Sequence, residues 1–500
     1  MALGAPDSTL CRMRISNKQA APMRRKLRGG CAVIAAAVLL ACGCSKPEPP
    51  AAFDRYQVGA YYYNWFPGKF SGRAYLRARL KPAQAPELGA YSSEDPAVIE
   101  RHIAWCSQYG IDFLAISWWP SGANQRPSFY DKLLEARNIG DISFCVFYET
   151  WSLGFNSETG STRLDEKAES VFLADMRQFA ETLFPHPSYL KIGGRPVVIL
   201  YLTRTLEGDY AQAIEKCRSA LKSMGWDVFL IADEIFWSVV PADKAPEEGA
   251  LSTDEPQPER IRLFDAITAY NLYDFSRTNH AGYGAQSDFI RDAAGLFERY
   301  RNAIGPGAAF VPSVIPGYND RGVRFRRDHF AIPRQWSPGS ADGSFLGEAI
   351  ERMVMPFMDP NLQMAIVTSW NEWNEDTAIE PLAAAPPTSL DESDSGREFT
   401  QGHAYAGAGT LYLETLRDRF CAVAGRVTRA GGAPAAGVPV LALRGGTPLA
   451  RDTTDKAGYF TLSRLRLPPG QYTVVAGNAR AQANVTRERT ALVALELPAP

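Results

Sequence analysis

Residues that bind metals or form disulfides are scarce in this sequence. The 500 residues include five histidines and eight cysteines, and no histidine belongs to an H-E-x-x-H motif. Only four of the cysteines follow Cys44, and none of them forms a C-x-x-C pair. Isolated cysteines in apolar patterns are typical of small buried side chains. The pattern indicates neither a zinc site nor a disulfide framework, so we predict a protein without a metal or another cofactor.

An excess of charge of either sign is also missing. The 53 Lys and Arg residues oppose 55 Asp and Glu residues, which gives a formal net charge of -2. The molecule as a whole therefore has no field that would attract nucleic acid or an anionic membrane surface. A neutral partner such as a glycan fits this balance. We predict no nucleic-acid partner, and we expect a monomer.

The sequence has no apolar run long enough to remain in a membrane. The most apolar stretch, residues 31–41, is shorter than the about 20 residues that a spanning helix needs. Basic residues at 24–28 precede it and small residues follow it, which is the layout of a cleaved secretory signal. This stretch therefore predicts export of the chain.

The end of this signal contains Leu39-Leu-Ala-Cys42, which resembles the bacterial lipobox, whose cysteine is lipidated. Cys44 is an offset alternative, and an ordinary signal without lipidation is another. We predict an N-terminal extension and lipoprotein signal peptide over 1–44, with Cys42 lipidated, and a Pro-rich tether over 45–56. The mature protein would be a lipoprotein of the bacterial cell envelope that meets the membrane through its lipid only.

From residue 57 the chain alternates short apolar runs with amphipathic segments. Buried apolar strands that alternate with helices are typical of a parallel sheet covered on both faces. Eight such repeats predict a (β/α)8 TIM barrel over residues 57–420. The alternative is an open doubly wound sheet, although no G-x-G-x-x-G follows the first strand. The eight runs are 58–63, 111–118, 142–148, 196–201, 228–232, 264–270, 309–315 and 364–370.

The sequence changes character after Phe420. Short alternating strands follow, with Gly, Pro and Asp at the turns and no helical pattern between them. Residues 421–500 therefore predict a small all-β, Ig-like sandwich. Residues 454–458 and 467–472 resemble features of the carboxypeptidase-regulatory-like, or transthyretin-like, module. Such a module would serve as a spacer or an adhesive addition.

In a barrel of this type the functional groups lie at the carboxyl ends of the strands, where the loops converge on one mouth. Nearly every predicted strand ends in aromatic and polar residues. Sugars combine apolar faces with hydroxyl edges, so this composition indicates a glycan site; the alternative is that the aromatic residues only fill the barrel rim. The predicted substrate-binding residues are Tyr62, Tyr63, Trp65, Trp118, Trp119, Glu149, Tyr270, Asn271, Tyr318, Asn371 and Trp373.

The eighth run leads directly into the most informative motif, at residues 368–381. Here Glu372 and Glu375 lie three residues apart at the predicted strand end. Two such carboxyl groups need not ionise together, because burial and mutual repulsion favour one proton between them. One acid and one base are what glycosidic cleavage requires. We predict that these two residues are catalytic; the alternative is a solvated acidic turn.

The motif from Asn371 to Pro381, Asn-Glu-Trp-x-Glu-x-Thr-x-Ile-Glu-Pro, resembles the signature of glycoside hydrolase family 99, the endo-α-mannosidases. It is also similar to WbsX-type proteins of O-antigen gene clusters, which are often labelled glycosyltransferases. The first two strands, at 58–65 and 110–119, carry further similarity. The resemblance implies a metal-free enzyme that cleaves internal α-mannosidic bonds of a polysaccharide or oligosaccharide with retention.

The resemblance also implies roles for single residues. Glu372 would remove the proton of the sugar 2-hydroxyl, whose oxygen then forms a 1,2-anhydro sugar. Glu375 would protonate the leaving group and then activate water. Glu149 and Tyr270 would line the cleavage subsite, and Trp118 or Trp119 would form the wall beyond it.

Two positions depart from the mannosidase pattern. This chain has Asn374 and Asp376 where those enzymes usually have His and Gly, so Asp376 adds a charge beside the proposed acid. The mannoside specificity therefore stays open. Two other functions remain: a glycosyltransferase, although no phosphate-binding Gly-rich loop is present, and a non-catalytic glycan-binding lipoprotein, which would not need both glutamates.

Overall fold

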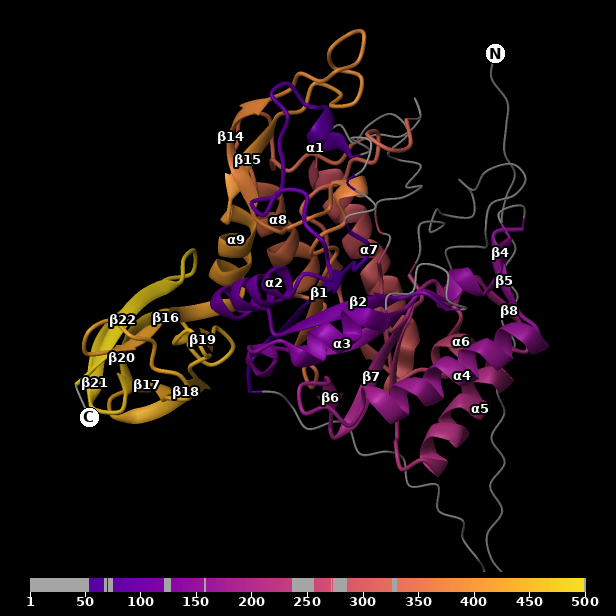
Figure 1. Cartoon of the computed structure of the whole chain (residues 1–500), viewed down its shortest axis with the longest axis horizontal. Coiled ribbons are helices and arrows are strands. Elements are labelled where there is room, and N and C mark those ends of the chain that lie inside the picture. Colours follow the sequence, from indigo (N-terminus) through magenta and orange to yellow (C-terminus); the bar gives the residue numbers. More distant parts are fainter. Residues whose placement is uncertain are drawn as a thin grey trace, which may run out of the picture. The chain divides into compact units, whose positions relative to one another are not determined.

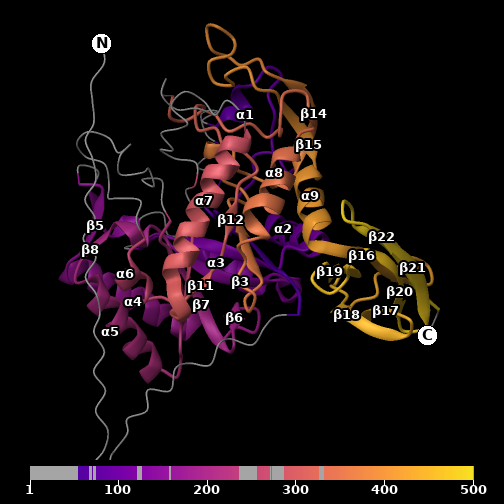
Figure 2. The same cartoon turned by 180° about the vertical axis from the view of Figure 1, so that it is seen from behind.

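The computed structural model describes residues 54–66, 70, 75–120, 127–156, 159–235, 256–270, 272, 286–325 and 331–498. Figures 1 and 2 show these residues from opposite sides. The predictions for the signal peptide, for most of the tether, for Cys42 and for Asn271 fall outside the described residues. Within the described residues, no helix combines the length and the apolarity that crossing a membrane would require.

A parallel sheet forms the centre of the molecule. Every neighbouring pair in the strand order β11-β10-β9-β7-β3-β2-β1-β13-β12 is parallel. Its strands are β1 (Gln57–Tyr62), β2 (Phe113–Trp118), β3 (Ser143–Tyr148), β7 (Arg195–Leu200), β9 (Phe229–Asp233), β10 (Ala266–Thr268), β11 (Ala309–Phe310), β12 (Ser313–Val314) and β13 (Met364–Val367). A short strand, β6 (Lys191–Ile192), pairs antiparallel with β7.

The sheet curls so far that its two ends belong to one segment of chain. β11 pairs with β10, β12 pairs with β13, and only Val311 and Pro312 separate β11 from β12. The Val311 N–H donates to the Ile267 carbonyl at 2.9 Å, and the Pro312 carbonyl accepts from the Ile366 N–H at 3.1 Å. Pro312 has no N–H to donate to a neighbouring strand. The hydrogen-bond ladder is therefore interrupted there, and the seventh predicted run is divided into two strands. The predicted α/β class with a TIM-barrel-like sheet is confirmed.

Helices surround this sheet on its outside (Figures 1 and 2). The second helix shows how the sequence fixes their ends: Asp95 accepts from the Ala97 N–H at 2.9 Å, Pro96 is the first helical residue, and Gly110 ends the helix at φ 77°. The helices are α1 (Leu76–Arg79), α2 (Pro96–Tyr109), α3 (Pro127–Glu135), α4 (Glu166–Thr182), α5 (Tyr210–Ser223), α6 (Pro258–Ile261), α7 (Gln286–Ile304), α8 (Ser344–Ala349) and α9 (Leu411–Phe420).

Two small sheets extend the loops at the carboxyl ends of the barrel strands. One contains β4 (Phe155–Asn156), β5 (Ser161–Leu164) and β8 (Leu206–Gly208). The other is the antiparallel pair of β14 (Leu382–Thr388) and β15 (Tyr405–Gly409). The periodicity of the sequence did not indicate either sheet.

The C-terminal part is all β, as predicted. It contains a three-stranded sheet, β19-β16-β22, and a four-stranded sheet, β18-β17-β20-β21, around a separate cluster of buried side chains that includes Phe460 and Tyr472. The strands are β16 (Cys421–Arg429), β17 (Pro439–Arg444), β18 (Thr447–Thr453), β19 (Tyr459–Ser463), β20 (Gly470–Ala476), β21 (Ala479–Val485) and β22 (Ala491–Leu497). The Ig-like identity of this part and the domain boundaries stay predictions.

The contact of β1 with β2 allows a test of the fold. A Cβ atom on Gly59 would lie 2.1 Å from Cζ of Phe113 on β2, so alanine there must displace a buried ring. We expect Gly59→Ala to lower the free energy of unfolding by about 1–3 kcal/mol, measured by denaturant titration. Gly140→Ala is the control, because a Cβ there meets nothing within 4 Å. Equal stability of the two variants would contradict this packing.

Candidate active site

The two glutamates of the motif lie on one tight turn after β13, in different surroundings. Glu372 is buried: its Oε1 accepts from the Asn374 N–H at 2.9 Å, and its own N–H donates to Ser369 Oγ at 2.8 Å. Glu375 ends the single 3-10 turn Trp373–Glu375, and its side chain is 17% exposed. One carboxylate is thus fixed from within the turn, whereas the other faces outward.

Glu375 has a cationic partner at the rim of the site. The guanidinium of Arg324 pairs with the Glu375 carboxylate and, at 3.1 Å, with Asp320. Asp320 is buried, but the Arg324 side chain is 52% exposed. Arg324 can therefore leave the pair for solvent when another group approaches Glu375.

The ends of the first and last barrel strands are joined directly. Asn371 accepts from the Tyr63 N–H and donates to the Tyr63 carbonyl, both at 2.8 Å. The Tyr63 hydroxyl donates to the Tyr270 hydroxyl, and burial raises the pKa of both hydroxyls well above the ordinary value. These neutral hydroxyls can bind a sugar hydroxyl as donors or acceptors.

Glu149 lies at the end of β3, buried among polar and aromatic groups. Ser117 Oγ donates to its Oε1 at 2.8 Å, and the Trp119 indole N–H donates to Ser117 at 3.0 Å. Burial raises the pKa of Glu149 to about 8. Burial also raises the pKa of Asp233 to about 8, although that carboxyl accepts from the Tyr270 N–H at 2.8 Å. Both groups carry a proton at neutral pH, so Glu149 can donate a hydrogen bond to a ligand.

Aromatic rings form a continuous row beside Glu149. Tyr63 stacks on Trp65 with ring centroids 4.3 Å apart, and Trp65 meets Trp119 edge-on at 5.9 Å. Trp119 meets Trp151 at 5.2 Å, and Trp151 is 36% exposed. Such a row offers flat apolar surfaces to sugar rings. Trp151 was not among the predicted residues, although it lies two residues after Glu149.

Three of the predicted binding residues lie elsewhere. Tyr62 bonds His102 at 3.1 Å, and Trp118 packs edge-on against Phe179 of α4 at a centroid distance of 4.8 Å. Both point to the layer between sheet and helices, because successive side chains of a strand point to opposite faces. Trp373 is buried and donates to Glu380.

Tyr318 lies after β12 and is buried. Its backbone N–H and carbonyl pair with those of Ile332, at 3.0 and 2.8 Å. This bridge closes the base of the loop that carries Arg324.

A carboxylate that the sequence analysis did not single out supports the motif from behind. Glu380 is fully buried and accepts from the Tyr91 hydroxyl at 2.7 Å and from the Trp373 indole at 3.1 Å. Its other oxygen contacts His102 at 3.1 Å. Tyr91 in turn accepts from Asn371 at 3.2 Å, so Glu380 helps to orient the residues on both sides of Glu372.

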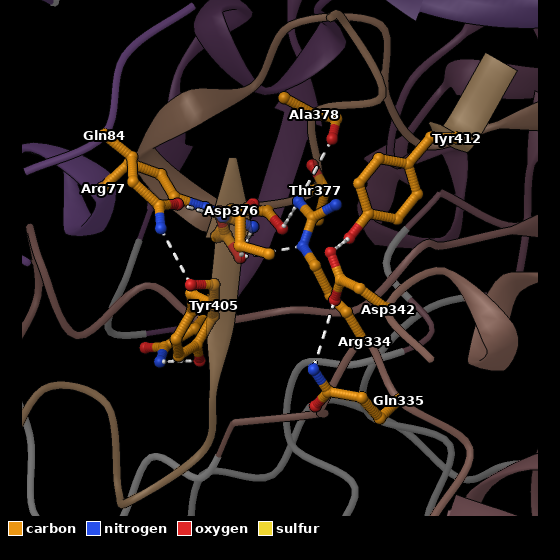
Figure 3. Close-up of polar contacts among 12 residues, drawn as sticks. Arg77, Gln84, Arg334, Gln335, Asp342, Asp376, Thr377, Ala378, Tyr405 and Tyr412 are labelled. Atoms are coloured by element: carbon orange, nitrogen blue, oxygen red, sulfur yellow. Dashed lines mark hydrogen bonds and ion pairs between the residues drawn. The ribbon is translucent and has the colours of Figure 1, made fainter. Parts of the chain in front are cut away.

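The charge of Asp376 is balanced inside the protein. Its carboxylate lies between the guanidinium groups of Arg77 and Arg334, as Figure 3 shows. The negative charge beside the proposed acid therefore has two positive neighbours of its own. Among the described residues, no group of three or more His, Cys, Asp or Glu side chains is arranged to hold a metal ion.

The raised pKa of Glu149 predicts a specific dependence of stability on pH. The folded-state pKa is about 8, against 4.5 for the ordinary carboxyl. Between these values the unfolded chain loses a proton that the folded protein keeps, so the free energy of unfolding falls as pH rises, by about 1.4 kcal/mol per unit of pKa difference. Below pH 4.5 the stabilisation that the raised pKa of Glu149 provides is fully present.

Glu149→Gln replaces the protonated acid with an amide that does not titrate. We expect the difference in Tm between variant and wild type to shift in favour of the variant as pH rises from 5 to 9, measured by calorimetry. At pH 4 the wild-type carboxyl is protonated in both the folded and the unfolded state. The difference in Tm between variant and wild type should there reflect the amide substitution alone. A difference in Tm that stays constant across this range would contradict the burial of a protonated Glu149.

Comparison with known proteins shows which family this chain belongs to. Residues 59–391 match the family model described as Glycosyltransferase WbsX. The glycoprotein endo-alpha-1,2-mannosidase of Rattus norvegicus is 24% identical over 356 residues, which is 65% of this chain and 68% of the rat protein. The endo-alpha-1,2-mannosidase-like protein of Homo sapiens is 22% identical over 392 residues, which is 69% of this chain and 73% of the human protein.

A solved structure described as a glycoside hydrolase-like protein has the same fold. It is 19% identical, with a TM-score of 0.52, and the match covers 75% of this chain and 96% of that one. The family model spans well over half of the chain, from within β1 through the other barrel strands to beyond the turn with both glutamates. The chain therefore belongs to the WbsX family, and its homologues include endo-α-mannosidases.

Proposed function

We propose that this protein is a glycoside hydrolase that cleaves internal α-mannosidic or related bonds of a polysaccharide with retention. The observation that carries the proposal is the turn after β13, which holds one buried and one outward-facing carboxylate. The homologous endo-α-mannosidases support the reaction class. The aromatic row and the protonated Glu149 support a sugar as the ligand.

In the first step Glu372 takes the proton of the sugar 2-hydroxyl, and that oxygen attacks the anomeric carbon. The bond to the leaving oxygen breaks while Glu375 gives that oxygen a proton. In the second step Glu375 takes a proton from water, the water oxygen attacks the anomeric carbon, and the 1,2-anhydro bond opens. Glu372 then returns its proton to O2, so atoms and protons balance and both carboxyls regain their first state.

The surroundings of the two carboxylates suit these different roles. Glu372 accepts a hydrogen bond within its own turn, which fixes it against one atom of the substrate. Glu375 must meet a leaving sugar first and a water later, and its exposed partner Arg324 can make room for both. Glu149 and the Tyr63–Tyr270 pair would hold the sugar between the glutamates and the aromatic row.

Two other functions stay in consideration. The family model is described as a glycosyltransferase, which favours transfer from an activated sugar. The protein could also bind glycans without catalysis. The C-terminal β-sheets, proposed here as a carboxypeptidase-regulatory-like module over 421–500, would serve either function as a spacer.

A panel of substrates separates these functions. Purified wild type is incubated with α-mannans and a set of bacterial polysaccharides, and separately with sugar nucleotides and acceptor glycans. We expect shortened oligosaccharides from at least one polysaccharide and no consumption of sugar nucleotides, measured by size-exclusion chromatography and mass spectrometry. Consumption of a sugar nucleotide would favour the transferase, and binding without any product would favour the non-catalytic lipoprotein.

We further propose that the protein is exported and lipidated at Cys42, which would place the enzyme at the cell envelope. Cys42→Ala should move the protein from the membrane fraction to the soluble fraction. Immunoblotting of the cell fractions measures this change. Cys44→Ala is the control and should stay with the membrane. The opposite result would assign the lipid to Cys44, and membrane association of both variants would contradict a single lipidated cysteine.

A further inference from the structure

Asp376 follows the proposed acid directly and has an unusual backbone conformation. Its φ angle is 49°, in the left-handed region that glycine adopts freely and other residues adopt less often. It ends the 3-10 turn of Glu375, and its own N–H donates to the Trp373 carbonyl at 3.3 Å. The backbone needs no carboxylate at this position, so the reason for the side chain lies in its contacts.

Those contacts join three remote segments in the interior. Asp376 Oδ1 accepts from Arg77 Nε at 2.6 Å, and Oδ2 accepts from Arg334 Nε at 3.0 Å. Arg334 Nη2 also donates to the Asp376 carbonyl at 2.5 Å and to the Ala378 carbonyl at 3.1 Å. All three charged side chains are at most 1% exposed. Figure 3 shows the carboxylate between the two guanidinium groups.

Each arginine is itself held in place. Arg77 Nη1 donates to Gln84 at 2.6 Å and to the Ala406 carbonyl at 3.0 Å, and its guanidinium lies 5.0 Å from the ring centroid of Tyr405. Arg334 lies 4.6 Å from the ring centroid of Tyr412. Arg77 belongs to α1, and Arg334 belongs to the loop after β12. The network therefore ties the turn to supports that do not belong to it.

These ties act on one glutamate more than on the other. Glu375 lies between two fixed points: its carbonyl accepts from the Asn319 N–H at 2.8 Å, and the next residue is Asp376. The Glu372 side chain is fixed by the N–H of Asn374 and its backbone N–H by Ser369, and its carbonyl contacts the Asp376 side of the turn, through the Thr377 N–H at 3.2 Å. A shift of Asp376 would displace the acid directly, while the carboxylate of the base keeps its hydrogen bond to Asn374.

We propose that Asp376 is a positioning residue that, through its ion pairs with Arg77 and Arg334, sets where Glu375 meets the leaving group. This inference rests on the proposed hydrolase function. The Asp376 side chain is 1% exposed and enclosed by the two arginines, so we expect it to act through Glu375 and not on the substrate itself. Its contribution therefore concerns protonation of the leaving group, and a substrate that needs no such protonation should not depend on it.

The test compares two substrates in the full-length protein. One is an α-mannan oligosaccharide, whose leaving sugar needs a proton; the other is a dinitrophenyl α-mannoside of matched chain length, whose leaving group departs as a stable anion. We measure kcat/KM, which reports the reaction steps from the free enzyme up to and including the first bond cleavage. Asp376→Glu keeps the charge and moves the carboxylate by one methylene, and Arg334→Lys keeps the charge but loses the paired donors.

We expect both variants to lose about 10- to 100-fold in kcat/KM on the oligosaccharide and less than about threefold on the dinitrophenyl glycoside. Asp376→Asn removes the anion that pairs with both buried guanidinium groups; should it not fold, the two charge-conserving variants decide. Asp265→Glu is the matched control. Asp265 also lies between two arginines, Arg195 at 2.7 Å and Arg218 at 2.8 Å, before β10 at the other end of the barrel strands.

Equal losses on both substrates would assign Asp376 a purely structural role and overturn the inference, as would unchanged activity on both. A control variant with the same preference for the dinitrophenyl glycoside would also overturn it. Wild type that cleaves neither substrate, nor any glycan of the panel, would overturn the proposed function itself. Failure of the inference alone is therefore distinguishable from failure of the hydrolase function.

Discussion

Glu375→Gln is expected to lower kcat/KM on a polysaccharide about a thousandfold and to leave most of kcat/KM on a dinitrophenyl glycoside, because kcat/KM covers only the steps up to the first bond cleavage. The amide keeps the size and the contact with Arg324 but cannot give a proton to the leaving oxygen. An activated leaving group needs no proton, so its cleavage requires only the base. The measurement compares kcat/KM of the variant with that of the wild type on each of the two substrates.

Glu259→Gln controls for the loss of a charge, because that side chain is 86% exposed on α6. It should not change either value. A Glu375→Gln variant that loses both activities equally would remove Glu375 from the acid role, and one that keeps both would remove it from the mechanism.

Glu372→Gln is expected to lower kcat/KM by at least about a thousandfold on both substrates. Without this base the 2-hydroxyl keeps its proton, and the first bond to the anomeric carbon does not form whatever the leaving group. The dinitrophenyl glycoside therefore should not rescue this variant. This contrast with Glu375→Gln distinguishes the base from the acid.

The same role makes a prediction for the substrate. Replacement of the 2-hydroxyl by fluorine removes the proton that Glu372 takes, so wild type should not cleave the fluorinated dinitrophenyl glycoside. Its cleavage at a rate near that of the parent compound would contradict participation of the 2-hydroxyl, even if Glu372 proves essential.

The strands of the barrel were predictable because each is a short apolar run between helical patterns. The division of the seventh run was not, because it depends on the missing N–H of Pro312 in a ladder that only the closed arrangement creates. The observed order of the strands agrees with the rule that successive parallel strands tend to neighbour each other.

Within the site, sequence reasoning could find the strand ends but not the direction of each side chain. Tyr62 and Tyr63 are adjacent and equally aromatic, yet only Tyr63 contacts Tyr270. Both faces of this sheet are buried, so no alternation of polar and apolar residues marks which side faces the mouth. The same ambiguity explains Trp118, which packs against helices, and Trp119, which reaches Ser117.

The supporting networks were beyond sequence reasoning for a different reason. Arg77 is 299 residues from Asp376 in the chain, and Tyr91 is 289 residues from Glu380. Neither arginine of the Asp376 network lies in a local motif, and a buried charge is recognisable only once its partner is known. The two carboxylates are visible in the motif, but their tasks depend on the fold.

The central claim is that this turn hydrolyses a glycosidic bond. The most direct test uses a polysaccharide that the wild type cleaves. It is digested in ¹⁸O-labelled water, and the fragments are analysed by mass spectrometry. We predict one ¹⁸O atom at each new reducing end with wild type and no labelled fragments with Glu372→Gln. Fragments without the label, or equal labelling by wild type and the variant, would contradict the account.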